Sequence, residues 1–388
     1  MKRKNAAKAT GINGDMEKKK RVAFIGPIEP FRSGVAKHSN QIALELCNRA
    51  DVELQVYSFK RLYPKILFPG DGDRDKYLRP PEQLGAKFWI DTLNPLTWQK
   101  VIVSIKRSNT DIVIIPAWTF FVAPCLGWIS RALRRSGIHV ISIVHNAFDH
   151  EAGHIKNVLM KYQLLNSTSF VCHNQSLADD INQVIETPKI VITPHPIFDQ
   201  YPQALGELKK RANLELLFFG IIRDYKGLDI LLEALSQLPD DIDYHLSIVG
   251  ECWSDINQYK NQAQALGLVD KIEFVDRYVS DQQAAEYFHR ADAVVLPYRS
   301  MTGTGVIPLA YHYQKPVIAT NLPAFHEVIK QGKTGFIGSA VSATSVAESL
   351  MEFTHNCNTD EMAKHIVDYR KMFSWQKFTE NTLSLGNL

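Results

Sequence analysis

Residues 298–318 read YRSMTGTGVIPLAYHYQKPVI, and this stretch decides the fold. The run before it, residues 291–297 (ADAVVLP), is typical of a buried strand, and the glycine-containing loop leads into an apolar, helix-like segment. The loop is therefore predicted to join the carboxyl end of a strand to the amino end of a helix, where unpaired N–H groups and the helix dipole favour a phosphate. The residues expected to bind the phosphate or its sugar are Ser300, Thr302, Gly303, Thr304, Gly305 and Val306.

The same alternation of short β-branched runs and longer amphipathic runs extends over most of the chain. The predicted strands of the first half are residues 21–26, 52–58, 111–116, 139–145, 169–173 and 190–194. The pattern then restarts, with predicted strands at residues 214–220, 244–250, 272–275, 293–296 and 317–319. Strands that alternate with helices indicate parallel sheets, so we predict two doubly wound α/β domains with a ligand site between their strand ends.

The domain boundaries follow from this pattern. Residues 1–20 are polar and basic, and we expect a disordered, solvated tail; the alternative is an electrostatic tether to anionic lipid. Residues 21–200 are predicted to form a first Rossmann-like domain and residues 213–370 a second one. Met1 and Met16 are both plausible starts of the chain.

The bulk composition excludes several classes of protein. A net charge of only +3 over 388 residues gives no reason to expect a nucleic-acid partner. The five cysteines are scattered, which argues against a disulfide framework or a zinc site and fits a cytoplasmic protein. No apolar run reaches the roughly 18 residues that a membrane span requires.

Two cations follow the predicted strand that ends at Gly220. Arg223 and Lys226 stand just before the helix that is expected to begin near Gly227. An arginine offers a bidentate fork and a lysine a point charge, a combination suited to a diphosphate. The alternative is that both are ordinary solvated cations.

Three further strand-end positions are candidates for ligand contact. Gly34 opens a helix with little side-chain bulk, so a ligand could approach the backbone there; an ordinary turn is the alternative. His145 could bind a sugar hydroxyl or move a proton, and a metal triad with Asp149 and His150 is a less favoured reading. Tyr278 could receive a nucleobase or serve only in packing.

In their order and spacing these segments resemble the retaining GT-B glycosyltransferases of the group 1, family-four-like type, which use nucleotide sugars. The resemblance covers residues 21–375, and its parts are PFRSGVAKHS, VHNAFDHE, ITPHPIFDQY, FFGIIRDYKGLDILLEAL, YVSDQQAAEYFHRADAVVLPY and TGTGVIPLAYHYQKPVIAT. It implies that the first domain binds the acceptor and the second the donor, and that residues 371–388 form a helix crossing back to the first domain.

The resemblance also implies roles for individual residues. Gly34 would abut the donor phosphate or the acceptor, and His145 would contact the transferred sugar. Arg223 and Lys226 would hold the diphosphate, and the helix beginning near Gly305 would point its amino end at the same phosphates. No metal or other cofactor is expected, because cationic side chains and a helix dipole can carry the leaving-group charge.

The chain departs from the family pattern at two places. Many relatives have a pair of glutamates at the positions held here by Met301 and Leu309. Many also have an arginine directly after the strand-ending glycine, where this chain has Ile221, and Arg223 is the expected substitute. We interpret these changes as a variant donor site and not as a loss of activity.

The predicted function is transfer of a sugar from a nucleoside-diphosphate sugar to an acceptor hydroxyl with retention, a hexosyltransferase-like activity in bacterial surface polysaccharide or glycoconjugate synthesis. The expected acceptor is a glycan or a lipid-linked glycan. Residues 118–135 are aromatic and basic and could touch the inner face of the cytoplasmic membrane; a core helix is the alternative. Two rival functions stay open, a nucleotide-sugar epimerase of the same fold and a non-catalytic nucleotide- or sugar-binding protein.

Overall fold

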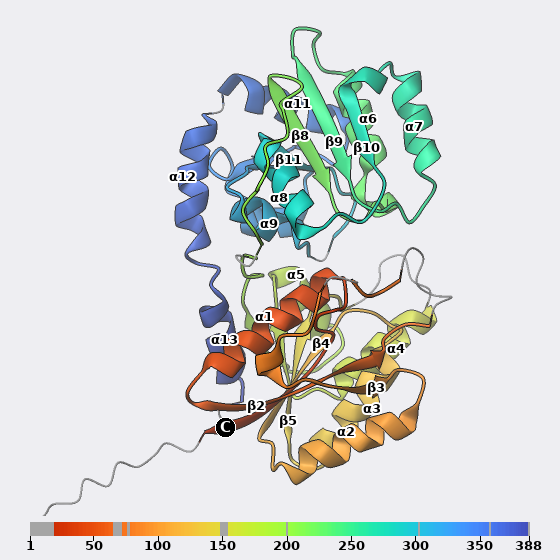
Figure 1. Cartoon of the computed structure of the whole chain (residues 1–388), viewed down its shortest axis with the longest axis vertical. Helices are drawn as coiled ribbons and strands as arrows, with labels where there is room; N and C mark the ends of the chain where they lie inside the picture. Colours follow the sequence, from red (N-terminus) through yellow and green to blue (C-terminus); the bar gives the residue numbers. More distant parts are fainter. Residues whose placement is uncertain are drawn as a thin grey trace, which may run out of the picture.

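Two parallel β-sheets organise the chain, each at the centre of one α/β domain (Figure 1). The computed structural model describes residues 19–64, 72–75, 78–147, 154–198, 201–301, 303–356 and 358–386. The predicted fold class, two doubly wound Rossmann-like domains, is confirmed. No helix in the described ranges is long and apolar enough to cross a bilayer.

The first sheet has seven parallel strands in the order β3-β2-β1-β4-β5-β6-β7. Its strands are β1 (Lys20–Ile25), β2 (Val52–Arg61), β3 (Lys87–Asp91), β4 (Ile112–Ala117), β5 (His139–Val144), β6 (Ser169–Cys172) and β7 (Lys189–Ile192). The helices are α1 (Gly34–Asn48), η2 (Glu82–Leu84), α2 (Pro95–Arg107), α3 (Ala123–Arg134), α4 (His154–Leu165) and α5 (Gln175–Asn182). Because every pairing is parallel, all strand carboxyl ends share one edge, and the strand order reverses between β1 and β4.

The second sheet has six parallel strands in the order β10-β9-β8-β11-β12-β13. They are β8 (Leu214–Phe219), β9 (Tyr244–Val249), β10 (Ile272–Val275), β11 (Ala293–Leu296), β12 (Val317–Ala319) and β13 (Gly335–Ile337). The helices are η3 (Asp224–Lys226), α6 (Leu228–Ser236), α7 (Ile256–Ala265), η4 (Val269–Lys271), α8 (Asp281–Arg290), α9 (Val306–His312), α10 (Pro323–Val328), α11 (Ala343–Asn356), α12 (Thr359–Arg370) and α13 (Trp375–Ser384).

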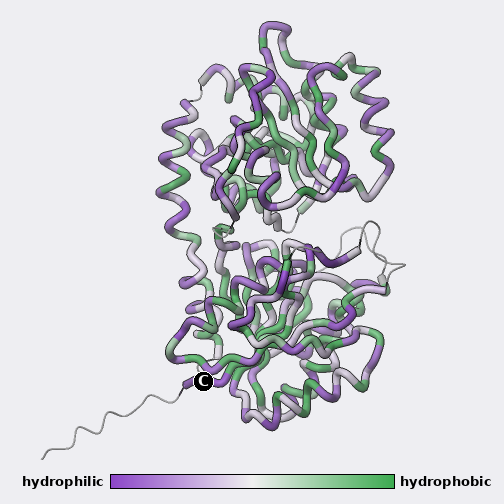
Figure 2. The backbone as a smooth tube through the Cα atoms, in the orientation of Figure 1, coloured by the Kyte–Doolittle hydropathy of each residue, from purple (hydrophilic) through white to green (hydrophobic). Residues whose placement is uncertain are grey.

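The central strands are continuous apolar runs because helices cover both faces of each sheet. β4 (IVIIPA), β5 (HVISIV) and β11 (AVVL) are buried along their whole length. In Figure 2 the strands of the sheets are mostly hydrophobic, whereas the outer helices alternate between hydrophobic and hydrophilic positions. The sequence did not predict β3 or β13; both are edge strands, where a short, partly buried segment carries little hydrophobic periodicity.

The chain passes between the domains twice, and the two crossings are joined. After α12 the chain returns to the first domain, where α13 packs against α1 (Figure 1). The Trp375 indole N–H donates to the Ile197 carbonyl at 2.7 Å, and the Ile197 N–H donates to the Phe373 carbonyl at 3.1 Å. Phe198 and Trp375 also belong to a buried core shared with the second domain. These contacts hold the carboxyl ends of the two sheets face to face.

Candidate functional site

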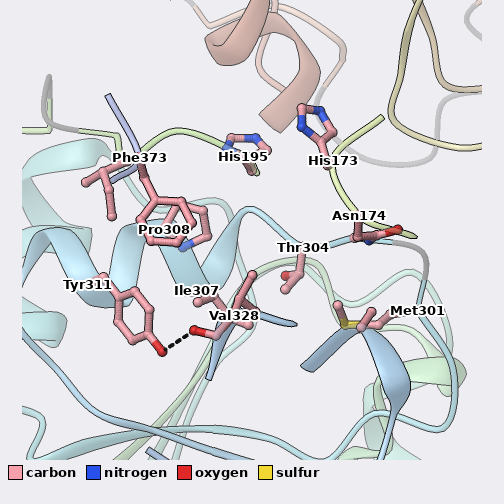
Figure 3. A pocket seen from close by; sticks show the side chains of 13 residues that line it. His173, Asn174, His195, Met301, Thr304, Ile307, Pro308, Tyr311, Val328 and Phe373 are labelled. Atoms are coloured by element: carbon pink, nitrogen blue, oxygen red, sulfur yellow. Dashed lines mark hydrogen bonds between the residues drawn. The ribbon is translucent and has the colours of Figure 1, made fainter. Parts of the chain in front are cut away.

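A pocket between the domains is lined by residues that follow strands of both sheets (Figure 3). From the first domain come His173 and Asn174, directly after β6, and His195, after β7. From the second domain come residues of the loop between β11 and α9, called the 298–305 loop below, among them Met301 and Thr304. In Figure 3 the two histidines lie on one side of the pocket, and Thr304 and Met301 on the other.

Lys226 is a buried cation in the second domain. Its side chain belongs to η3, the residue is 8% exposed, and its ammonium lies 5.7 Å from the centre of the Tyr298 ring. A Cβ on Gly220 would lie 3.1 Å from Nζ, so the ammonium sits at the carboxyl end of β8. Burial, followed by the charge of Arg223, lowers the pKa of Lys226 to about 7. A cation held in this way is stabilised by any anion that reaches it.

Arg223 is the exposed partner of Lys226 in this loop. Its guanidinium faces two aromatic rings, with Cζ 5.6 Å from the centre of Tyr225 and 5.9 Å from that of Trp253. Aromatic faces stabilise a guanidinium through cation–π and stacking interactions. The structure therefore places both residues predicted to bind the diphosphate at the same strand end, with Lys226 buried and Arg223 at the surface.

An ion pair that the sequence did not single out fastens two loops of the site together. The Arg299 guanidinium donates to both carboxylate oxygens of Asp229, at 2.7 Å for Oδ1, and to the Asp224 carbonyl at 2.9 Å. The Arg299 N–H donates to the Tyr225 carbonyl at 2.8 Å. These bonds join the start of the 298–305 loop to the loop of Lys226. Only spatial proximity could have revealed this pair, because the two residues belong to different βα units.

Gly227 allows the same two loops to approach closely. Its φ of +65° is in the left-handed region, and a Cβ there would lie 2.0 Å from the Pro297 carbonyl oxygen. Only glycine fits this position without a shift of the backbone. The cation loop and the strand end before the 298–305 loop are therefore in direct backbone contact.

The 298–305 loop has little side-chain bulk near its glycines. No atom lies within 4 Å of a Cβ built on Gly303, whereas one on Gly305 would approach the Phe198 ring at 3.3 Å. The Val306 N–H, at the start of α9, donates to the Thr304 hydroxyl at 3.1 Å. Ser300 lines a separate groove beside α7, and Thr302 lies outside the described residues. Ligand contacts from this loop stay a prediction.

The two positions at which the family resemblance implies glutamates are apolar and pack against other residues. Met301 lines the interdomain pocket, and Leu309 is buried in the core shared by the domains. A carboxylate at the second position would be enclosed among apolar groups, which is unfavourable unless the charge is paired.

Four histidine rings meet beneath the pocket, although the sequence pointed to only one of them. The ring of His38, on α1, lies 4.7 Å from that of His145, 5.1 Å from that of His173 and 4.5 Å from that of His195. His145 and His173 are also neighbours, at 5.0 Å. We call these four residues the histidine cluster. His145, which was expected to contact the sugar, thus packs against other imidazoles.

The histidine cluster is held in the neutral form. Burial lowers the pKa of His145 to about 3 and that of His195 to about 4, and it lowers the pKa of His38 and His173 well below the usual value. The Nε2 of His145 and both ring nitrogens of His38 have no hydrogen-bond partner in the described chain.

No three or more His, Cys, Asp or Glu side chains in the described ranges are arranged to hold a metal ion. The alternative triad with Asp149 and His150 falls outside those ranges.

Gly34 and Tyr278 lie where the two domains touch. Gly34 is exposed at the start of α1, and a Cβ on it would meet no atom within 4 Å. Next to it, the Arg32 guanidinium lies 5.0 Å from the Tyr278 ring centre and 3.6 Å from the Glu251 carboxylate. Tyr278, the predicted nucleobase contact, thus packs against the first domain.

The family match of this chain lies mostly in its second domain. Residues 204–371 match the family described as glycosyl transferases group 1. The chain is 23% identical over 230 residues to an uncharacterized glycosyltransferase of Methanocaldococcus jannaschii, covering 56% of this chain and 58% of the relative. It is 31% identical over 158 residues to the phosphatidyl-myo-inositol mannosyltransferase of Mycobacterium leprae, covering 40% of each. The aligned part thus spans about half the length of these relatives.

The fold is similar over nearly the whole chain to solved structures. Sucrose-phosphate synthase from Thermosynechococcus elongatus has a TM-score of 0.69 at 15% identity, covering 95% of this chain and 98% of the other. Anabaena HepE in complex with UDP-glucose has a TM-score of 0.67 at 15% identity, covering 94% and 99%. The chain therefore has the GT-B fold, and its residues 204–371 match the glycosyl transferases group 1 family.

Proposed function

We propose that the protein transfers a sugar from a nucleoside-diphosphate sugar to an acceptor hydroxyl. The observation that carries the proposal is Lys226, a buried cation beside Arg223 that forms no ion pair with a described carboxylate. Burying an unpaired charge is unfavourable, so a site that keeps one gains most when an anion binds. A diphosphate offers two such charges at the strand end where both cations lie.

The same two cations account for leaving-group stabilisation. As the bond between the anomeric carbon and the phosphate oxygen breaks, its electron pair stays on the nucleoside diphosphate. Lys226 and Arg223 would stabilise the charge that develops there, which lowers the barrier where water is excluded. With two cations in this role, no metal or other cofactor is proposed.

We propose that the transfer proceeds with retention of anomeric configuration. No carboxylate is among the residues that line the described interdomain pocket, so none is placed there as a covalent nucleophile. The acceptor oxygen would bond to the anomeric carbon on the face that the phosphate leaves, and its proton would pass to the departing phosphate oxygen. The rate would come from positioning and charge stabilisation.

The acceptor is proposed to be a glycan or lipid-linked glycan, bound on the first domain during surface polysaccharide or glycoconjugate synthesis in the bacterial cytoplasm. Two proteins that the chain matches support this class: a phosphatidyl-myo-inositol mannosyltransferase of Mycobacterium leprae, and a GDP-mannose:glycolipid 4-beta-D-mannosyltransferase of Xanthomonas campestris. HepE binds UDP or UDP-glucose, and the Xanthomonas campestris relative is a GDP-mannose enzyme, so uracil and guanine are both candidate donor bases.

A thermal-shift screen tests donor binding. We expect UDP, GDP or ADP to raise the melting temperature by several degrees, since a ligand at 100 times its Kd stabilises the native state by about 2.7 kcal/mol. The matched monophosphates UMP, GMP and AMP lack the β-phosphate and should shift the melting temperature much less at equal concentration. If no diphosphate shifts the melting temperature at millimolar concentration, the proposed donor class is wrong.

A further inference from the structure

Three adjacent helices of the first domain contain basic residues and no acidic ones. These helices are α2 (PLTWQKVIVSIKR), α3 (APCLGWISRALR) and α4 (HIKNVLMKYQLL), and none contains an aspartate or glutamate. α3 packs between α2 and α4, so the three form one layer over the first sheet (Figure 1). We call this layer the α2–α4 face. A face whose helices contain only basic charged residues is unusual in a chain with 44 basic and 41 acidic residues.

The α2–α4 face also exposes large apolar side chains. Trp128 on α3 is 50% exposed, and Ile155 and Val158 on α4 are 76% and 50% exposed. Leu165, at the end of α4, and Leu96, in the first turn of α2, are exposed as well. Scattered exposed apolar residues are ordinary on a protein surface, but several on neighbouring helices indicate an interaction site.

Exposed apolar and basic residues lie on the same side of both α3 and α4. On α3, Trp128 and Arg131 are three positions apart and both exposed, which places them on one side of the helix. On α4, Val158 and Lys161 have the same spacing and are both exposed. The Arg134 guanidinium donates to the Leu165 carbonyl at 2.8 Å and ties the ends of the two helices together.

We propose that the α2–α4 face binds the surface of an anionic lipid bilayer. Lysine and arginine ammonium and guanidinium groups would meet the lipid phosphates, and Trp128, Ile155 and Val158 would enter the boundary between headgroups and acyl chains. A soluble acidic partner or a nucleic acid would be attracted by the cations alone. The apolar side chains between them fit a surface that is charged outside and apolar beneath.

The position of this face fits a lipid-linked acceptor. α2, α3 and α4 follow β3, β4 and β5, so each begins at the carboxyl edge of the sheet, the edge that borders the interdomain pocket. A protein lying on this face would have its pocket next to the membrane. This proposal rests on the acceptor part of the proposed function and is independent of the donor part. Bilayer binding and nucleoside-diphosphate binding can therefore be tested separately.

Sedimentation with lipid vesicles tests the proposal. At 100 mM salt the protein should bind vesicles containing 30% phosphatidylserine at least tenfold more tightly than vesicles of phosphatidylcholine alone, since each basic residue near the surface adds attraction. The variant Arg131→Glu with Lys161→Glu should weaken this binding tenfold or more. The variant Trp128→Ser with Ile155→Ser should weaken it several-fold while the charge is unchanged.

A matched control carries the same types of change on the other domain, Val269→Ser with Lys260→Glu, both at exposed positions, and should bind like the parent. Nucleoside-diphosphate binding by every variant shows that it is folded and separates this test from the donor proposal. Failure to bind anionic vesicles would overturn the proposal, as would binding that neither face variant weakens. Binding weakened by the charge variant alone would contradict insertion and point to a nucleic-acid or acidic-protein partner.

Discussion

Replacing Arg223 and Lys226 together with alanine is expected to lower donor turnover about a thousandfold or more, since removing one group that stabilises transition-state charge typically costs a hundredfold to a thousandfold. The loss should appear mainly in kcat, because the charge on the diphosphate grows as the sugar leaves. Steady-state kinetics with the donor found in the thermal-shift screen measure both parameters. A matched control, Lys260→Ala with Lys364→Ala, removes two exposed cations of the C-terminal half and should leave turnover unchanged.

The stability of a single variant separates this effect from unfolding. Burial lowers the pKa of Lys226, so the native state bears a cost for keeping that charge. Lys226→Met should therefore melt at the same or a higher temperature than the parent while losing nucleoside-diphosphate binding. A group kept at a cost to stability is typical of functional sites. If Lys226→Met bound the diphosphate as the parent does, Lys226 would have no part in the donor site.

Lowering the pH from 7.5 to 5 is expected to remove several kcal/mol of stability through the histidine cluster. In the unfolded chain each imidazole regains its usual pKa near 6.5, whereas burial keeps the pKa of His145 at about 3 and that of His195 at about 4. Between those values the unfolded chain binds protons that the folded protein does not, so stability falls as the pH falls. At pH 5 each such histidine contributes a loss of about 2 kcal/mol.

Urea unfolding at pH 7.5, 6 and 5 measures this loss. Lys226, with a folded pKa of about 7, adds to the loss between pH 7.5 and 6 in parent and variant alike, but not between pH 6 and 5, where it is protonated in both states. His38→Leu keeps an apolar side chain against Trp375 and Phe378 and removes one ring whose pKa burial lowers, so its loss between pH 7.5 and 5 should be smaller than that of the parent. An identical pH dependence for parent and variant would show that the cluster is not buried in the neutral form.

The sequence was sufficient to predict the architecture because parallel strands buried on both faces leave a direct signal. Runs such as IVIIPA and HVISIV are apolar throughout, and the helices between them are amphipathic. The edge strands β3 and β13 lack this signal and were missed. The cations Arg223 and Lys226 were found because they follow a strand-ending glycine within one short segment.

The remaining parts of the site depend on contacts between segments far apart in the sequence. His38, His173 and His195 are isolated histidines on three different elements, and they meet His145 only through the order of the strands. The bond between Arg299 and Asp229 likewise joins two βα units. Local sequence patterns do not predict such pairs, because the two residues become neighbours through the strand order of the sheet and not through a single turn or helix.

Proton NMR of the donor during turnover measures whether the protein transfers a sugar with retention. The protein is incubated with the nucleoside-diphosphate sugar chosen by the screen and an acceptor fraction, and the anomeric signal is followed over time. We expect the donor signal to decay, free nucleoside diphosphate to accumulate, and the new glycoside to have the same anomeric configuration as the donor. All three changes should be suppressed in Arg223→Ala with Lys226→Ala. Isomerisation of the sugar without acceptor, a product of inverted configuration, or no consumption of a donor that binds would each contradict the proposed transfer with retention.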